Sequence, residues 1–276
     1  MYLVATPIGN LSDISERAIE TLKSVDFIAA EDTRVSRKLL THFGIKKPLV
    51  SYHEFNRFDA GNKILTRLKK GESCALVTDA GTPGVSDPGV DLVRLCSDAD
   101  IPVVSLPGPC AVICALSLSG LDTSRFVFEG FLPADKKKRL FALNDIKQEK
   151  RTIVFYEAPH KLKRTLADML SVFGDRSVSV SREITKLYEQ TLRMTLSDMV
   201  EYFDRNAPRG EFVLVVEGAK DIAACENAQS ALFESAVKSA KKLIEDGMSV
   251  RDASRKAALD TGCSRNDLYK TLISTG

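Results

Sequence analysis

The sequence predicts an α/β protein that ends in a small C-terminal helical domain. In the first 120 residues, short apolar segments alternate with helical patterns; the segments are 2–6, 27–30, 49–52, 74–77 and 103–106. Strands separated by helices form a mostly parallel sheet, because each helix returns the chain to the edge at which the next strand starts. The 276 residues, 44% of them hydrophobic, are enough for two such domains and an appendage.

The strand at 74–77 and the loop after it form the clearest candidate for ligand binding. The loop is rich in residues that leave little room for side chains, so a ligand can approach the backbone. These residues are Gly81, Pro83, Gly84, Pro88 and Gly89. Pro88 is expected in the first turn of a helix over 90–99, where the missing N–H of proline costs nothing.

The remaining elements follow the same alternation. Helices are expected over 15–25, 35–43, 61–70 and 111–118 in the first domain. A second α/β domain begins near Leu121, with strands expected at 126–129, 152–156, 177–181 and 212–217 and helices at 136–146 and 161–173. A turn is expected at 130–133. In both domains the polar clusters lie at strand ends.

The chain changes character from Asp221 onward. Three helical stretches are expected, at 229–245, 250–259 and 265–273. Ala258, Gly262 and Leu268 have the spacing of a helix-turn-helix, in which a small residue allows a close helix crossing and glycine makes the turn. An ordinary three-helix domain is the alternative interpretation.

Composition limits the class of protein. Basic residues number 39 and acidic residues 37, so the net charge of +2 argues against a globally basic nucleic-acid binder and leaves room for a local basic patch. The N-terminus enters a strand directly, and no run of 18 apolar residues occurs. We therefore expect a cytoplasmic protein without a membrane span.

The cysteines and histidines do not suggest a metal site. The six cysteines have no CxxC spacing and lie mostly in apolar runs, which predicts reduced core thiols; they are Cys74, Cys96, Cys110, Cys114, Cys225 and Cys263. The three histidines are scattered. The phosphate-binding patterns GxxxxGK[ST] and GxGxxG and the nucleophile elbow GxSxG are also missing from the sequence.

Several strand-end loops share a composition of Gly, Pro, Ser and Thr. They lie at 7–10, 81–89, 107–111, 157–159 and 210–211. Each loop alone is explained by a tight turn. Their recurrence at strand ends predicts one shared pocket, in which a ligand is recognised through backbone donors and acceptors.

Ordered motifs run along the whole chain. They are LVATPIGNLSDIS at the start, AEDTR at 30–34, TDAGTPGVSDPG at 78–89, LPGP at 106–109, FEGFLP at 128–133, FYEAPH at 155–160, SREITK at 181–186 and RGEFVLVVEG at 209–218. With these motifs the chain resembles the ribosomal RNA 2′-O-ribose methyltransferases of the tetrapyrrole methylase superfamily. The resemblance implies two α/β domains of the class III methyltransferase type, at 1–120 and 121–222, and a helical domain at 223–276.

The resemblance also implies an activity. It implies S-adenosylmethionine as methyl donor, a homodimer, and 2′-O-methylation of a cytidine in the decoding centre of 16S rRNA in the 30S subunit. It further implies cofactor contacts from the loops; these contacts are Pro7, Gly81, Thr82, Pro83, Pro107, Ala111, Tyr156, Glu211, Phe212 and Val213. Within the loop at 78–89, Asp79 and Asp87 are carboxylates suited to hold the amino group or the ribose of the cofactor. The segment 7–10 replaces a longer glycine and acidic loop of many tetrapyrrole enzymes, which argues against a macrocyclic substrate.

Methyl transfer to a ribose hydroxyl suggests which side chains are needed. A base within hydrogen-bond reach of the hydroxyl, or a cation that stabilises the developing alkoxide, accelerates such a reaction by about 100-fold or more. Among the strand-end acids we expect Glu31 or Glu183 to accept the proton. Arg34, Arg182 and Lys186 are the expected anion contacts. Positioning alone is the alternative role for each of them.

The predicted RNA surface is the segment 131–164. It holds ten basic and four acidic residues, and its basic run begins with Lys136, Lys137, Lys138 and Arg139. Together with Arg182, this run is expected to contact phosphate, although a solvated helix face explains the pattern equally well.

Two rival functions remain open. One is C-methylation of a tetrapyrrole or another small molecule. The other is a non-catalytic DNA-binding regulator that uses the C-terminal helices, although the segment 231–276 carries only eight basic against six acidic residues.

Overall fold

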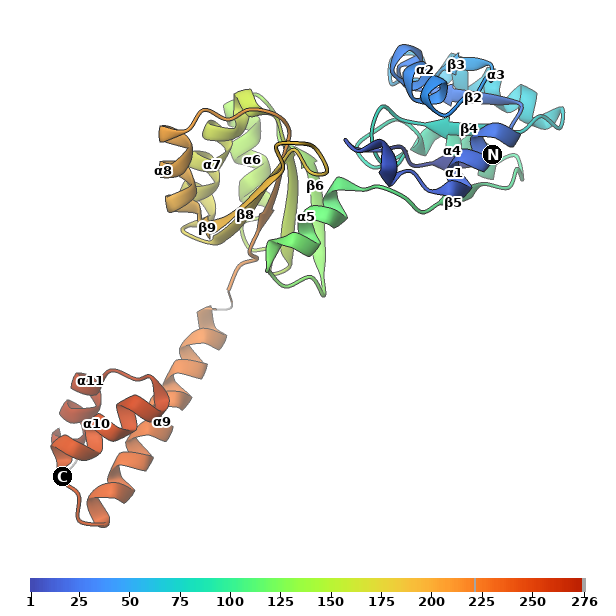
Figure 1. The fold of residues 1–276 in the computed structure, drawn as a ribbon. Helices are drawn as coiled ribbons and strands as arrows, with labels where there is room; N and C mark the ends of the chain where they lie inside the picture. The colour runs from blue at the N-terminus through green and yellow to red at the C-terminus, as the bar shows by residue number, and fades with distance from the viewer. Residues whose placement is uncertain (221, 275–276) are drawn as a thin grey trace. The chain divides into compact units, whose positions relative to one another are not determined.

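The computed structural model of the chain describes residues 1–220 and 222–274 (Figure 1). The chain divides into two compact units, residues 1–218 and 219–276. The first unit contains two sheets, and the second contains the helices α9 (Ile222–Glu245), α10 (Val250–Thr261) and α11 (Arg265–Ser274). The predicted boundary between two α/β domains at residue 120 lies inside the first unit and stays a prediction.

The first sheet is parallel and lies between two helical layers. Its order among the described residues is β3-β2-β4-β1-β5. The strands are β1 (Tyr2–Val4), β2 (Phe27–Ala30), β3 (Leu49–Ser51), β4 (Cys74–Val77) and β5 (Val104–Leu106). The short helix η1 (Leu11–Asp13) precedes α1 (Glu16–Ser24), which packs with α2 (Thr33–His42) on one face; α3 (Arg57–Lys69) and α4 (Val90–Ser97) pack on the other. The predicted α/β class and parallel sheet are confirmed.

Capping residues determine where the helices of this sheet begin. The Ser15 hydroxyl accepts from the backbone N–H of Ala18 at the start of α1, and the Asp32 carboxylate accepts from the N–H of Arg34 at the start of α2. The prediction that Pro88 lies in the first turn of α4 is wrong, because Gly89 is the N-cap. A Cβ at Gly89 would come within 3.0 Å of the Gly84 nitrogen, so the chain turns there before the helix starts.

The second sheet is mixed, with the order β6-β7-β10-β8-β9 in the described residues. Its strands are β6 (Phe126–Phe131), β7 (Thr152–Glu157), β8 (Ser177–Arg182), β9 (Gln190–Thr195) and β10 (Phe212–Val216). Only β6 and β7 pair in parallel. The turn predicted at 130–133 is wrong for its first two residues, because β6 continues to Phe131 after a register shift between Phe128 and Gly130. Gly130 allows this bulge through its positive φ of 65°.

Successive side chains of the central strands point to opposite faces of the second sheet, so each face has its own hydrophobic core. Ile153 and Phe155 of β7 face the helices α6 (Lys136–Asp145), α7 (Pro159–Phe173) and α8 (Leu196–Arg205), whereas Val154 and Tyr156 face α5 (Ala111–Ser119). The helix α5 therefore packs on the second sheet, although the predicted boundary assigns it to the first domain. Figure 1 shows α5 beside this sheet.

One strand of this sheet and one helix that packs on it were not predicted. The strand β9 pairs antiparallel with β8, and α8 follows it directly from Leu196. The strand β9 is an edge strand in which no residue is fully buried, so its sequence lacks the apolar run that identifies β10.

The predicted phosphate contact from Arg139 is wrong, because its side chain is buried. The guanidinium of Arg139 binds Asp168 of α7 through Nε at 2.8 Å and Nη2 at 2.7 Å. Its Nη1 donates to the carbonyl oxygens of Pro133 and Ala134. Only 4% of the side chain is exposed, whereas Lys136, Lys137 and Lys138 lie at the surface. Arg139 therefore ties α6 to α7.

The second unit is a small three-helix domain, as predicted. Its core consists largely of alanines; the buried residues are Ala236, Ala240, Ala253, Ala257, Leu268 and Leu272. Gly262 ends α10 with a left-handed φ of 72° and makes the predicted turn into α11. Small side chains at the crossing allow the helices to approach closely.

The cysteines are reduced where the structure describes their side chains. Cys74, Cys96, Cys110, Cys114 and Cys263 are free thiols, and Cys225 lies outside the described side chains. Within residues 1–220 and 222–274, no helix is long and apolar enough to cross a membrane.

Replacing Arg139 by alanine tests its structural role. Arg139→Ala should lower the free energy of unfolding by about 3 kcal/mol, because Asp168 would remain as a mostly buried charge without its partner. The change is measured by urea denaturation. Lys137→Ala, on the exposed face of the same helix, is the matched control and should change stability by less than about 0.5 kcal/mol. Equal small effects would contradict the role of Arg139 as a buried tie.

Candidate active site

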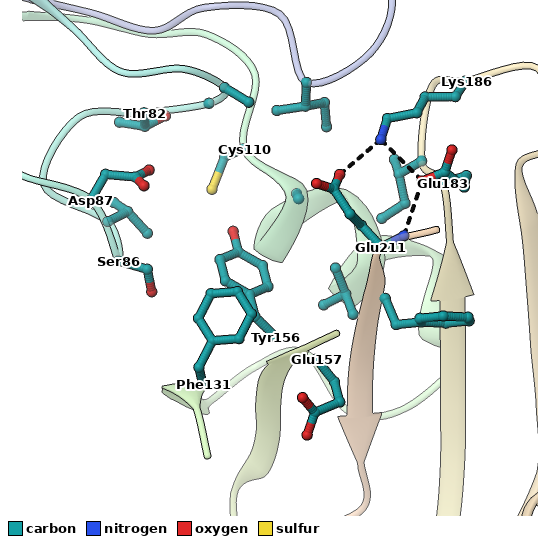
Figure 2. A pocket seen from close by; sticks show the side chains of 18 residues that line it. Thr82, Ser86, Asp87, Cys110, Phe131, Tyr156, Glu157, Glu183, Lys186 and Glu211 are labelled. Carbon is teal, nitrogen blue, oxygen red and sulfur yellow. Dashed lines mark hydrogen bonds and ion pairs between the residues drawn. The ribbon is translucent and has the colours of Figure 1, made fainter. Parts of the chain in front are cut away.

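A cavity lies at the strand ends of both sheets in the first unit (Figure 2). Its lining comes from the loop after β4, the start of α5, the ends of β6 and β7, the loop after β8 and the start of β10. The lining residues are Ile8, Ala80, Gly81, Thr82, Val85, Ser86, Asp87, Cys110, Ala111, Phe131, Tyr156, Glu157, Glu183, Ile184, Lys186, Glu211, Phe212 and Val213. The predicted loops thus converge on one cavity.

The loop after β4 is fixed to the backbone on both sides. The N–H of Thr6 donates to the Gly81 carbonyl at 2.9 Å, and the N–H of Gly81 donates to the Thr6 carbonyl at 3.0 Å. The Thr82 hydroxyl donates to the Pro109 carbonyl at 3.0 Å. Because both backbone polar groups of Gly81 are used inside the protein, this residue contributes space to the cavity rather than hydrogen bonds.

One wall of the cavity carries a cluster of three charged groups. The Lys186 ammonium lies 3.0 Å from Oε1 of Glu183 and 2.7 Å from Oε2 of Glu211, and the N–H of Glu211 donates to Oε1 of Glu183 at 3.0 Å (Figure 2). Gly210 has a φ of 85°, and a Cβ there would collide with the Glu183 side chain. The glycine before Glu211 therefore makes room for the cluster.

The ion pair holds Glu183 and Lys186 in their charged forms. Burial raises the pKa of Glu183, but the hydrogen bonds from the Glu211 N–H and the Lys186 ammonium outweigh burial and leave this pKa below its usual value. Burial lowers the pKa of Lys186, and its bonds to Glu211 and Glu183 bring that pKa above normal. Glu183 is consequently a weak base in this structure.

The pKa of Asp87, on the opposite wall, is shifted in the opposite direction from that of Glu183. Burial, followed by the nearby charges of Glu31 and Asp79, raises the pKa of Asp87 to about 7. Burial also raises the pKa values of Glu31 and Asp79. In contrast to Glu183, Asp87 has no cation among these influences. At neutral pH it therefore binds a proton more readily than an ordinary aspartate does.

Aromatic rings form the floor of the cavity. The Tyr156 ring contacts Phe128 at 5.0 Å and Phe131 at 5.4 Å between centroids. The Lys161 ammonium lies 5.6 Å from the Phe131 centroid and 2.9 Å from Oε1 of the buried Glu157. Phe131 nevertheless remains 56% exposed, so this pairing holds an accessible ring beside the cavity.

The structure brings together part of the set of residues that the sequence predicts. Nine of these residues line the cavity: Gly81, Thr82, Ala111, Tyr156, Glu183, Lys186, Glu211, Phe212 and Val213. Pro7, Pro83 and Asp79 are next to lining residues in the chain, and Pro107 lies three residues before Cys110, but none of the four lines the cavity. Their cofactor contacts stay predictions.

The other predicted catalytic and binding residues lie apart from the cavity. Glu31 and Arg34 are at the end of β2 and the start of α2, where Arg34 forms an ion pair with Asp32 at 2.6 Å. Arg182 ends β8, on the strand face of Val178 and Val180, and its Nε is buried without a partner in the described residues. The cavity therefore does not contain Glu31, Arg34 or Arg182.

Sequence reasoning missed several lining residues. Ile8, Val85 and Ile184 add apolar wall, and Phe131 adds an aromatic ring. The sequence places Phe131 in a turn, but the residue ends a strand beside Tyr156. This position brings its ring to the cavity. Among the described residues, no group of His, Cys, Asp and Glu is arranged to hold a metal ion.

Asp87→Asn tests the shifted pKa of Asp87 through stability. The usual Asp pKa is 3.8 and the folded value is about 7, so folding takes up a proton between these pH values and stability falls as pH rises through them. Asparagine stays neutral. The Tm advantage of the variant should therefore grow by a few degrees from pH 5 to pH 8 and then level off. An advantage that is the same at both pH values would show that Asp87 titrates normally.

Comparisons with known proteins place this fold and cavity in a family. The family model described as Tetrapyrrole (Corrin/Porphyrin) Methylases matches residues 1–200. The chain is 48% identical to the ribosomal RNA small subunit methyltransferase I of Synechocystis sp. over 98% of this chain and 96% of that protein. It is 45% identical to the protein of the same name from Bacillus subtilis, over 98% and 92%.

Solved structures share the fold at much lower identity. Diphthine synthase has a TM-score of 0.60 at 14% identity, covering 79% of this chain and 89% of its own. A cobalt precorrin-4 methyltransferase has a TM-score of 0.55 at 17% identity, covering 78% and 93%. The family model and the near full-length relatives agree with the motif resemblance. The chain belongs to the tetrapyrrole methylase family, in the group named ribosomal RNA small subunit methyltransferase I.

Proposed function

We propose that the protein is an S-adenosylmethionine-dependent methyltransferase that methylates the ribose 2′-oxygen of a cytidine in 16S rRNA of the small ribosomal subunit. The observation that carries the proposal is the identity of 42–48% with relatives named as small-subunit rRNA methyltransferases, over at least 98% of this chain. The specific nucleotide and the 2′-oxygen come from the motif resemblance. A homodimer in the cytoplasm stays a prediction.

The lining of the cavity fits the chemistry of S-adenosylmethionine. This molecule combines an adenine, a ribose diol, an amino acid and a sulfonium cation. The apolar and aromatic side chains of Ile8, Val85, Tyr156 and Ile184 suit the adenine, and carboxylates such as Glu211 suit the ribose hydroxyls or a cation. Lys186 offers a cation for a carboxylate.

The protein must then prepare the acceptor hydroxyl. When bound, S-adenosylmethionine supplies an electrophilic methyl group, and no metal is needed for the displacement. The chain contributes a cavity that aligns the acceptor oxygen and limits the access of water. It also has to accept the hydroxyl proton, because the product ether carries none.

We assign the proton-accepting role to Asp87. A general base works best when its pKa lies near the working pH, and the pKa of Asp87 is about 7. Glu183 is a weaker candidate, because its Oε1 already accepts from the Glu211 N–H and the Lys186 ammonium. Glu31 does not line the cavity and acts here by raising the pKa of Asp87. We therefore propose Asp87 as the base in place of Glu31 and Glu183, which the sequence favours.

Lys186 is the cation that reaches the cavity wall. Its ammonium is shared between Glu183 and Glu211, so its positive charge is partly balanced. We propose that it positions the carboxylate of Glu211 for the ligand and contributes a weaker stabilisation of negative charge on the acceptor oxygen.

Methylation of a tetrapyrrole is a weaker alternative. The cobalt precorrin-4 methyltransferase is only 17% identical to this chain, and such a match supports a common fold alone. The DNA-binding regulator is also weaker, because it assigns no task to the charged cavity.

The activity is tested by transfer of a radiolabelled methyl group to 30S subunits that lack the modification. We expect incorporation into 16S rRNA at one cytidine, and the methylated linkage should resist alkaline hydrolysis because its 2′-oxygen is blocked. Naked rRNA, duplex DNA and a tetrapyrrole precursor are assayed in parallel. Incorporation into the tetrapyrrole but not into the subunits would replace the proposal with the C-methyltransferase alternative.

The role of Asp87 is tested by single-turnover rates across pH. In the unaltered protein the rate should rise about tenfold per pH unit below pH 7 and level off above it, because only the ionised carboxylate accepts a proton. Asp87→Asn should lower the plateau rate by roughly 10²-fold to 10⁴-fold and remove this dependence.

Glu31→Gln is the matched control for Asp87. It removes the largest nearby negative charge acting on Asp87, so the midpoint of the pH profile should move to lower pH while the plateau rate is kept. A large loss of plateau rate in Glu31→Gln, with Asp87→Asn active, would return the role of base to Glu31.

A further inference from the structure

The outward face of α2 is a basic stripe outside the segment predicted to bind RNA. Arg34, Arg37, Lys38 and His42 lie on this face with Thr41 and together line a shallow surface cavity. Ser36 and Leu40 point inward and are buried. The segment 33–48 contains five Lys or Arg residues and no acidic residue. Its charge is therefore uninterrupted along the chain.

Two of the three Lys and Arg side chains of this stripe have no ion-pair partner among the described residues. Arg34 is held by Asp32 through Nε and Nη2, and this contact lowers the pKa of Asp32 to about 2. The side chain of Arg34 is still 87% exposed. Arg37 and Lys38 are exposed and form no ion pair with any other residue that the structure describes. Arg37 and Lys38 thus carry two unpaired positive charges next to Arg34, whose guanidinium is held in place by Asp32.

Part of the basic run at 136–164 is compensated by acidic partners. Arg139 is paired with Asp168, Arg151 with Glu149, and Lys161 with Glu157. Because these partners neutralise part of the positive charge, the net charge counted along the sequence overstates the attraction to phosphate. The stripe on α2 lies in a segment without acidic residues, which makes it a phosphate-binding candidate besides the exposed Lys136, Lys137 and Lys138.

The stripe begins at the edge of the first sheet that carries the cavity. The helix α2 starts directly after β2, and the Asp32 N–H donates to Oδ1 of Asp79 in the loop after β4 at 3.1 Å. That loop continues into residues 80–82 and 85–87, which line the cavity. The stripe therefore leads from this edge along the outside of the helix.

The dimensions of the stripe suit a phosphate backbone. From Arg34 to His42 the helix rises about 12 Å, at about 1.5 Å per residue. In duplex DNA, successive phosphates of one strand are separated by about 3.4 Å of axial rise alone. The stripe is therefore long enough to contact more than one phosphate of a strand. Guanidinium groups also bind phosphate oxygens in a bidentate manner.

We propose that the outward face of α2 binds the phosphate backbone of the RNA next to the nucleotide that enters the cavity, through Arg37, Lys38 and Arg34. The inference rests on the proposed function, because it takes the substrate to be RNA. It assigns the contact to the first sheet of the molecule, whereas the sequence assigned it to 131–164 and Arg182.

The test compares two double variants that remove the same charge. Arg37→Gln with Lys38→Gln alters the stripe, and Lys69→Gln with Lys70→Gln alters the exposed end of α3, which leads into the start of β4 at the opposite edge of the sheet. Dissociation constants for 30S subunits lacking the modification are measured from about 50 to 200 mM salt. The stripe variant should bind more weakly, and its slope of log K against log salt should be smaller by about 2. The α3 variant should match the unaltered protein.

Other measurements separate the possible outcomes. Binding of S-adenosylmethionine and the Tm should be unchanged in the stripe variant, because its substituted side chains are exposed and lie outside the cavity. If Tm falls, Arg37→Gln alone is used, with an expected slope change of about 1. A stripe variant that keeps the full salt slope, in a protein that methylates RNA, would overturn the inference and leave the proposed function intact. If the unaltered protein neither binds nor methylates RNA, both fail.

Discussion

The reciprocal hydrogen bonds between Thr6 and Gly81 are the constraint on which the arrangement of the cavity depends. They join Thr6, two residues after the end of β1, to the loop that follows β4. The segments that leave these two neighbouring parallel strands are therefore held together at one edge of the sheet. The Thr82 hydroxyl extends this connection to the turn before α5. Since α5 packs on the second sheet, the same contacts link the loop to the strand ends on the other side of the cavity. A ligand there meets walls that are positioned before it binds.

The two sides of the cavity hold carboxylates in opposite states. On one side, Lys186 and a backbone N–H keep Glu183 ionised; on the other, burial and like charges push the pKa of Asp87 to about 7. Environments that separate the pKa values of two acids also separate their roles, one in positioning and the other in proton transfer.

The fold was predictable to the extent that apolar runs identify buried strands. The strands β2 and β4 match their predicted ranges, because each is buried along its whole length and ends at a polar cluster. The strand β9 and the helix α8 were missed, since an edge strand with exposed polar residues has no such run. The end of β6 was missed for another reason: Gly130 looks like a turn residue, and only pairing with β7 shows that it makes a bulge within the strand.

The sequence alone determined the α/β class, the parallel first sheet, the helical C-terminal unit and, through its motifs, the family. It also identified the loops that converge on the cavity, because glycine and proline at strand ends have a local backbone cause. Tertiary structure decided which side chains of these loops meet. It placed Asp87 and Phe131 in the cavity, buried Arg139 against Asp168 and left Arg37 and Lys38 uncompensated. Charge along a chain does not reveal which charges are paired, since pairing and burial depend on neighbours that are distant in sequence.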